Sequence, residues 1–431
     1  MVPWDWIAAA ARFVRANPRR AAVAAATSAA LIVGIWLWGS QAVPRSPPRS
    51  EPAREAAREQ PDPASSAAII TTRPEVKVGD ELCGYGPLPL RDGIPYVPED
   101  IETAAAAAFT HIADDLAARS DDRDRALGLH LQALGAGNAA ADAWVRDHGK
   151  CADGDEACSS AMSAAAAAAA AAGQSALARL ASTTSDPEVY ALAMQSCVVS
   201  SAGDCALLSY AQWARIEPDN AVPWLYLAAE AQGRHDGSGL QAAIARAAAA
   251  RYSNNYWESE SRLVASDTFA AQPEPIQVLL TVQLIGVQAA YALPPIQVIG
   301  QYCRAPMQAD AEVCTNLASL LIAHSRTAIE IYLGGRIAER LGWTDPRVSI
   351  LRDEVDALRW QLAQPVDPST NTVSSCESLQ RFRRDMRTRA RSGEADLLRR
   401  RLLESGVSVS EAAKQWRLEQ SRKADRAAPA Q

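Results

Sequence analysis

The sequence predicts an all-α protein whose paired helices are stapled by disulfides and preceded by one transmembrane helix. Three observations lead to this prediction. Apolar residues make up 48% of the 431 residues, yet aromatic residues make up only 6%, because alanine supplies much of the apolar content. Alanine is the strongest helix former and is poorly suited to strands. Residues 21–43 form one uncharged stretch, and all eight cysteines follow it.

The stretch 21–43 is the predicted membrane span. About 20 apolar residues cross the hydrocarbon core of a bilayer, and this stretch meets that length. Trp36 and Trp38, near its outer end, are typical of the aromatic belt at a membrane surface. A cleaved secretory signal is the alternative, with a cleavage site around 40–42. The apolar core of such a signal is only about 7–15 residues long, so we expect an uncleaved anchor.

The charges that flank the span do not decide its orientation. Four arginines lie on each side: Arg12, Arg15, Arg19 and Arg20 before it, and Arg45, Arg49, Arg54 and Arg58 after it. The cysteines decide instead, because disulfides persist outside the reducing cytosol. We therefore expect residues 1–20 in the cytoplasm and the body in the periplasm, with one pass through a bacterial inner membrane. The richness in alanine and arginine is typical of GC-rich bacterial genomes.

Composition divides the rest of the chain into three parts. Residues 44–68 are rich in proline, serine and charge and are expected to form a disordered spacer. The helical body then covers 69–376, and an arginine-rich helical tail covers 377–431. The tail carries 14 basic and 8 acidic side chains, whereas the whole chain has a net charge of −7, so the body is acidic. An acidic body excludes nucleic acid as its expected partner.

The cysteines fall into pairs by proximity along the chain. Short segments with turn residues separate the members of three pairs, and the remaining two cysteines flank the body. Eight cysteines allow 105 connectivities, so proximity favours one of them without proving it. The expected pairs are Cys151 with Cys158, Cys197 with Cys205, Cys303 with Cys314, and Cys83 with Cys376. Zinc ligands favour spacings of about two to four residues and nearby histidines, so no metal site is expected.

Helices are expected in several stretches of the body. Asp or Asn followed by proline in the first turn marks helix starts at Pro187, at 220–223 and at Pro346. The other expected helices are 101–119, 122–135, 156–172 ended by Gly173, a buried core helix at 276–292, 313–341 and 346–363. In the tail we expect one or two helices solvated on most faces.

The region 187–256 carries a pattern of small and large residues near the junction of two helical hairpins. Its repeat-packing positions are Ala206, Tyr210, Pro218, Trp224, Leu227 and Ala228. These residues and their spacing resemble the 34-residue tetratricopeptide repeat, with departures at Trp213, Leu240 and Tyr252. The resemblance implies an array of helical hairpins, in which the small residues permit close helix contact and Pro218 separates two helices. In that family such arrays bind partner proteins or peptides.

The sequence contains no motif that specifies catalysis, and we assign no catalytic, cofactor-binding or metal-binding residue. The adjacent carboxylates Asp114 and Asp115 lie at neighbouring positions of a helix and do not share a face. The pair Asp121 and Asp122 has the same spacing. His324 lies in an apolar helix, where a hydrogen-bonded core histidine is expected.

These observations favour a membrane-anchored periplasmic scaffold that binds a protein or peptide partner, and not an enzyme. Two alternatives remain at this point. One is an envelope enzyme whose site is assembled from scattered residues. The other is a structural protein that binds anionic lipid or an acidic partner through its arginine-rich tail.

Overall fold

The structure is a computed structural model, and it describes residues 81–427 except for short gaps at 92–93, 153–154, 198–202, 265, 291–293, 305–307, 344–345 and 364–374. The predicted cytoplasmic segment 1–20, membrane span 21–43 and spacer 44–68 lie outside the described residues. The described chain is mostly helical, as the sequence predicts. Two small antiparallel hairpins open it: β1 (Glu81–Leu82) with β2 (Gly86–Pro87), and β3 (Leu90–Arg91) with β4 (Ile94–Pro95).

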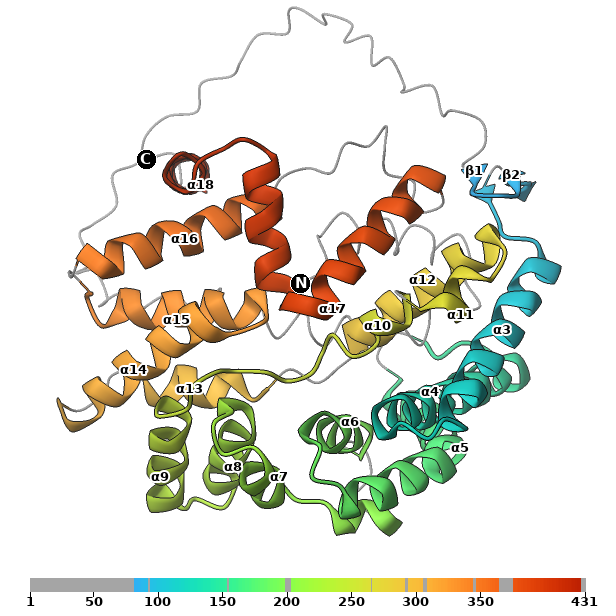
Figure 1. Cartoon of the computed structure of the whole chain (residues 1–431), viewed down its shortest axis with the longest axis horizontal. Helices are drawn as coiled ribbons and strands as arrows, with labels where there is room; N and C mark the ends of the chain where they lie inside the picture. The colour runs from blue at the N-terminus through green and yellow to red at the C-terminus, as the bar shows by residue number, and fades with distance from the viewer. Residues whose placement is uncertain are drawn as a thin grey trace, which may run out of the picture.

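The helices follow one another in antiparallel or crossing pairs (Figure 1). The first group packs α4 between α3 and α5, and α12 lies against α3. A second group packs α8 between α7 and α9. In a third, α14 contacts α15, α15 contacts α16, and α16 contacts α18. The helices are α3 (Glu99–Ala117), α4 (Asp122–His148), α5 (Glu156–Thr183), α6 (Pro187–Cys197), the 3-10 helix η1 (Gly203–Leu207), α7 (Tyr210–Ile216), α8 (Ala221–Gly233), α9 (Gly237–Ala248), α10 (Ser261–Val264), α11 (Asp267–Ala270), α12 (Glu274–Ala290), α13 (Ile296–Tyr302), α14 (Gln308–His324), α15 (Ala328–Arg340), α16 (Pro346–Ala363), α17 (Cys376–Glu404) and α18 (Val409–Ala427).

The predicted helix starts at Pro187 and Pro346 are the first residues of α6 and α16. The start predicted at 220–223 is also confirmed, because Asn220 caps α8 by accepting a hydrogen bond from the backbone N–H of Val222.

Three of the expected helices were bounded wrongly. Helix α4, expected at 122–135, continues to His148. Helix α5 continues through Gly173 to Thr183. A Cβ at Gly173 would lie 3.0 Å from the backbone nitrogen of Ala133, so this glycine permits close contact with α4. The continuous helix expected at 313–341 is instead α14 and α15, separated at 325–327 where Thr327 caps α15 by accepting from the N–H of Glu330.

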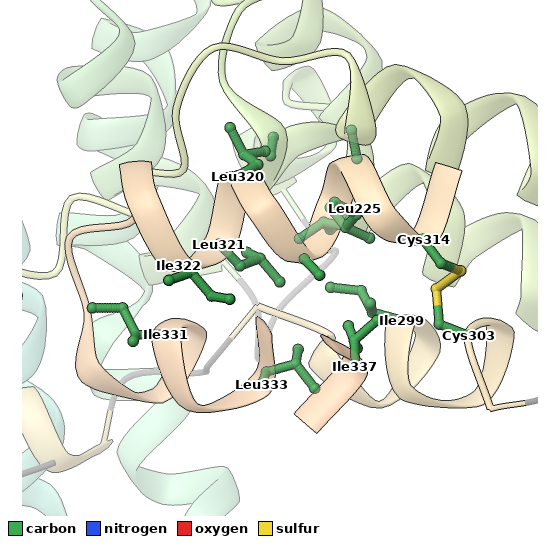
Figure 2. Packing of buried hydrophobic residues seen from close by; sticks show 14 of the residues in the cluster. Leu225, Ile299, Cys303, Cys314, Leu320, Leu321, Ile322, Ile331, Leu333 and Ile337 are labelled. Atoms are coloured by element: carbon green, nitrogen blue, oxygen red, sulfur yellow. A yellow bond between two sulfur atoms is a disulfide. The ribbon is translucent and has the colours of Figure 1, made fainter. Parts of the chain in front are cut away.

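Three large apolar clusters form the core. The first lies among α8, α9 and α13–α16, with the Cys303–Cys314 disulfide at one end (Figure 2). The second joins β1, α3, α4 and α10–α12. The third lies among α4–α8 and includes the fully buried Tyr190 and Trp213.

Helix α17 joins the first cluster to the second, so the expectation of a solvated tail is wrong for this segment. Leu379 and Met386 lie in the second cluster, and Ala395 and Leu398 lie in the first. The helix kinks between these two sets at Gly393, whose φ is 87°. A Cβ at Gly393 would lie 2.9 Å from the carbonyl oxygen of Arg326, so the kink requires glycine for both its conformation and its space.

Candidate functional site

The largest concentration of buried polar side chains lies around the segment 253–262, which follows α9, runs across the middle of the molecule and ends in the first turn of α10 (Figure 1). We call this segment and the polar side chains that contact it the polar seam. Asparagine side chains shape its start, since Asn254 accepts from the N–H of Tyr256 and Asn255 accepts from the N–H of Trp257. The contacting side chains are His130, Glu188, Gln288, Arg326, Glu330 and Arg389.

At the centre of the polar seam, Glu260 faces His130 of α4. Their nearest atoms, Oε1 and Nε2, are 3.8 Å apart, and His130 Nδ1 is in hydrogen-bond contact with Ser196 Oγ. Glu260 is fully buried, and neither of its carboxylate oxygens has a hydrogen-bond partner among the described residues. A serine, a histidine and a carboxylate in this order occur in hydrolytic triads. Here His130 and Ser196 are also buried, 3% and 8% exposed, so substrate has no direct access to them.

Burial changes the proton equilibria of this pair. It raises the pKa of Glu260 to about 8, with Glu258 and Glu188 raising it further and Arg389 opposing them. It lowers the pKa of His130 to about 4. Because buried charge is costly, the pair retains one proton at neutral pH.

We predict that the Glu260–His130 pair makes the protein less stable as the pH rises from about 6.5 to 8. In the unfolded chain the pKa of Glu260 is 4.5 and that of His130 is 6.5, so both groups lose their protons as the pH rises past 6.5. The folded protein then binds one more proton than the unfolded chain, and its free energy of unfolding falls with pH. Over this window the loss is about 1 kcal/mol, because each pH unit contributes at most about 1.4 kcal/mol and one of the two groups is half titrated at each end of the window.

Glu260→Gln removes this titration. Urea unfolding of the wild type and E260Q at several pH values between 6.5 and 8 measures the difference, and the fall of about 1 kcal/mol should be absent from E260Q. Glu230→Gln is the control, since Glu230 is exposed and should leave the wild-type slope unchanged. If the free energy of unfolding of E260Q falls with pH as steeply as that of the wild type, Glu260 is not the group responsible.

Glu188 connects α6 to the polar seam. Its Oε1 accepts from Ser259 Oγ at 2.7 Å and lies 2.8 Å from Arg262 Nη2. Arg123 of α4 approaches the other oxygen at 3.6 Å. One hydroxyl and two guanidinium groups therefore compensate the carboxylate. Such compensation is needed because Glu188 is only 8% exposed and an isolated buried charge is costly.

Arg389 connects α17 to the polar seam. It donates from Nη1 to Gln288 Oε1 at 3.0 Å, and its guanidinium lies 4.8 Å from the centre of the Trp257 ring. Nη2 is 3.8 Å from Glu394 Oε1, and Glu394 in turn accepts from the N–H of Ala328. One buried cation thus links α12, the segment 253–262 and the start of α15.

A second polar junction, around Glu217, closes the turn between α7 and α8. Its carboxylate accepts four hydrogen bonds, from Trp213 Nε1, Asn220 Nδ2, Tyr252 OH and Tyr256 OH, at 2.6 to 3.0 Å. Contact with Glu217 and burial raise the pKa of Tyr252 and of Tyr256, with burial the larger cause. Each carboxylate oxygen accepts two hydrogen bonds from the protein itself, so no acceptor position is left for a ligand, which indicates a structural role.

The residues predicted from the repeat pattern are only partly brought together. Tyr210 stacks on Tyr226 with ring centres 4.4 Å apart, and Ala228 is fully buried. Trp224 and Leu227 pack against the first apolar cluster. Pro218 is exposed, and its carbonyl accepts from Trp224 Nε1 at 3.0 Å.

Ala206 does not share a helix with Tyr210 and does not pack between helices, contrary to the prediction. Ala206 is exposed in η1. The helical conformation is interrupted between η1 and α7, and Ser209 caps the start of α7.

The eight cysteines lie at disulfide distance in the four pairs that proximity favours. The S–S distances are 2.06 Å for Cys83–Cys376, 2.14 Å for Cys151–Cys158, 1.99 Å for Cys197–Cys205 and 1.95 Å for Cys303–Cys314. Cys83, Cys376 and Glu274 also have ligand atoms within 4.8 Å of one another. In the disulfide, however, the two sulfurs bind each other and are not thiolate ligands.

The paired carboxylates noted in the sequence serve local structure. Asp114 accepts from Gln132 and Asp115 pairs with Arg119, while Asp121 caps α4. Sequence reasoning missed His130, Ser196, Glu260 and Arg389, because they come from four distant parts of the chain and no spacing links them.

One helix in the described part of the chain, α5, is long and apolar enough to cross a membrane by length and composition alone. It packs against α4 and α6, and the Cys151–Cys158 pair lies at its start. This makes α5 a helix of the body.

Comparison of the chain with protein-family models, curated proteins and solved structures found no match.

Proposed function

We propose that this protein is a helical scaffold held in the bacterial inner membrane by residues 21–43, with its body in the periplasm, where it binds a protein or peptide partner. The observation that carries the location is the pairing of all eight cysteines after one apolar stretch. Such a framework persists in an oxidising compartment. The predicted spacer 44–68 would then give the body freedom to reach partners near the membrane.

A scaffold is favoured over an enzyme by the state of the polar groups. The Ser196–His130–Glu260 group is sealed from solvent, and the Glu217 carboxylate is saturated by four donors from the chain itself. Both arrangements specify one packing of helices, which is what a rigid binding surface requires.

The resemblance of residues 187–256 to the tetratricopeptide repeat supports protein or peptide binding as the proposed role. Asn220 and Asn254, 34 residues apart, each accept a hydrogen bond from the backbone two residues later, at Val222 and Tyr256. The spacing equals the length of that repeat. The inner faces of α8 and α9 pack into the core through Leu225 and other side chains, which leaves Ala242 and Ala245 of α9 exposed.

Photocrosslinking tests the proposed binding surface. We predict that a photoreactive residue at Ala242 or Ala245, in the full chain expressed in a bacterial membrane, yields one discrete adduct with a partner. The exposed Ala168 of α5 is the control and should not yield that adduct. The same products from all three positions, or none from α9, would contradict the assignment.

A further inference from the structure

Helix α17 presents three exposed arginines on one face. Arg384, Arg387 and Arg391 occur at i, i+3 and i+7 and are each exposed, so they lie within one stripe of the helix surface. We call them the cationic face. No carboxylate among the described residues forms an ion pair with any of the three. Arg400, beyond the kink, is also exposed and donates to Thr388, one helical turn from Arg384 and Arg391.

Acidic side chains of the same helix are already paired with other arginines. Glu377 pairs with Arg381 at 2.8 Å, and Asp385 pairs with Arg401 at 2.5 Å. The other arginines of α17 are used within the fold: Arg389 is buried, and Arg399 pairs with Glu354 and Asp396. The charge of the cationic face is therefore available for an external anion.

The Cys83–Cys376 pair places this face beside the point where the chain enters the body. Cys83 lies in the hairpin that opens the described chain, and Cys376 is the first residue of α17, with their Cα atoms 4.7 Å apart. Figure 1 shows the start of α17 near β1 and β2. At 1.5 Å per residue, Arg384 and Arg391 lie about 12 and 23 Å further along the helix.

A chain anchored through 21–43 would hold this face near the bilayer. The predicted spacer 44–68 has 25 residues, and a flexible chain of that length has a root-mean-square span of roughly 25–30 Å. The arginines therefore meet the membrane surface at high effective concentration. Guanidinium groups bind phosphate oxygens through paired hydrogen bonds.

We propose that Arg384, Arg387 and Arg391 dock the body onto anionic phospholipid headgroups of the membrane that carries the chain. This inference rests on the proposed membrane anchor and adds to it a preferred orientation of the body. Each basic side chain near an anionic bilayer strengthens the contact about 5-fold, so three arginines shift the docking equilibrium roughly 100-fold. Because the contact is electrostatic, salt weakens it.

The test uses the full chain inserted in nanodiscs of neutral phosphatidylcholine, or of the same lipid with about one third phosphatidylglycerol. A fluorescent residue replaces the exposed Gln380, one turn before Arg384, and the lipid headgroups carry a quencher. We expect much stronger quenching in the anionic discs, and a fall to the neutral level near 1 M salt, where the Debye length is about 3 Å.

R384E/R387E/R391E should reduce quenching in anionic discs to the neutral level, and the triple glutamine variant should reduce it partly. The matched control R215E/R246E/R251E changes the same charge on exposed residues of the α7–α9 region and should quench like the wild type. Equal quenching in the two lipids, or no effect of the α17 substitutions, overturns the inference. Failure of the chain to remain with the discs after a carbonate wash instead contradicts the proposed anchor.

Discussion

Replacing Cys83 and Cys376 together with serine is expected to lower the free energy of unfolding by about 5 kcal/mol. The pair closes a loop between residues 293 apart in the sequence, which spans most of the described chain. In the chain-entropy account, a longer closed loop restricts the unfolded chain more strongly, and the loss on opening it is larger. The pair also ties the first hairpin to α17, whose own buried side chains join two of the apolar clusters.

The matched control is C151S/C158S, because that pair is separated by only 7 residues. Its removal should cost about 2–3 kcal/mol by the same relation. Urea unfolding followed by far-ultraviolet circular dichroism measures both variants against the wild type. Equal losses for the two pairs would contradict the view that Cys83–Cys376 restricts the unfolded chain over its full length.

Arg389→Ala is expected to destabilise the protein by about 3–5 kcal/mol. The substitution removes the hydrogen bond to Gln288 and the packing on Trp257. It also takes away the guanidinium group that lies 3.8 Å from the buried carboxylate of Glu394. Breaking a buried charge network from one side is costly because the remaining groups stay desolvated. Arg389→Met, which keeps much of the side-chain volume, should recover part of the packing loss and little of the electrostatic loss.

Arg387→Ala is the control for this prediction, since Arg387 lies on the exposed side of the same helix, two residues away. A surface substitution of this kind changes stability by no more than about 0.5 kcal/mol. Denaturant unfolding of the two variants under identical conditions makes the comparison. Similar stabilities for R389A and R387A would mean that the polar seam does not hold α17 in place.

Local sequence signals predicted the helical content and several of the helix starts, which depend on residues close together in the chain. Alanine richness indicated helices, and proline after a capping residue located the starts of α6 and α16. The break before α15 was also open to prediction, because Thr327 and Glu330 form the capping pattern in which a threonine is followed by a glutamate three residues later. We missed it because the apolar periodicity of 313–341 runs on through the break.

The role of α17 was harder to predict, because its charge conceals its core positions. Leu379, Phe382 and Met386 have the spacing of one buried helix face, but the next buried position is Arg389. The kink at Gly393 then turns the buried face of the helix in another direction. The polar seam left no sequence pattern at all. Its members His130, Glu188, Glu260 and Arg389 converge only when α4, α6, the segment 253–262 and α17 pack together.

The most direct test of the account is the disulfide state of the full chain taken from intact bacteria. Free thiols are alkylated under denaturing, non-reducing conditions, and the linked peptides are mapped by mass spectrometry. A periplasmic body predicts no alkylated cysteine and a linked peptide that joins Cys83 to Cys376, besides the three local pairs. Eight alkylated cysteines would contradict both the framework and the exported location.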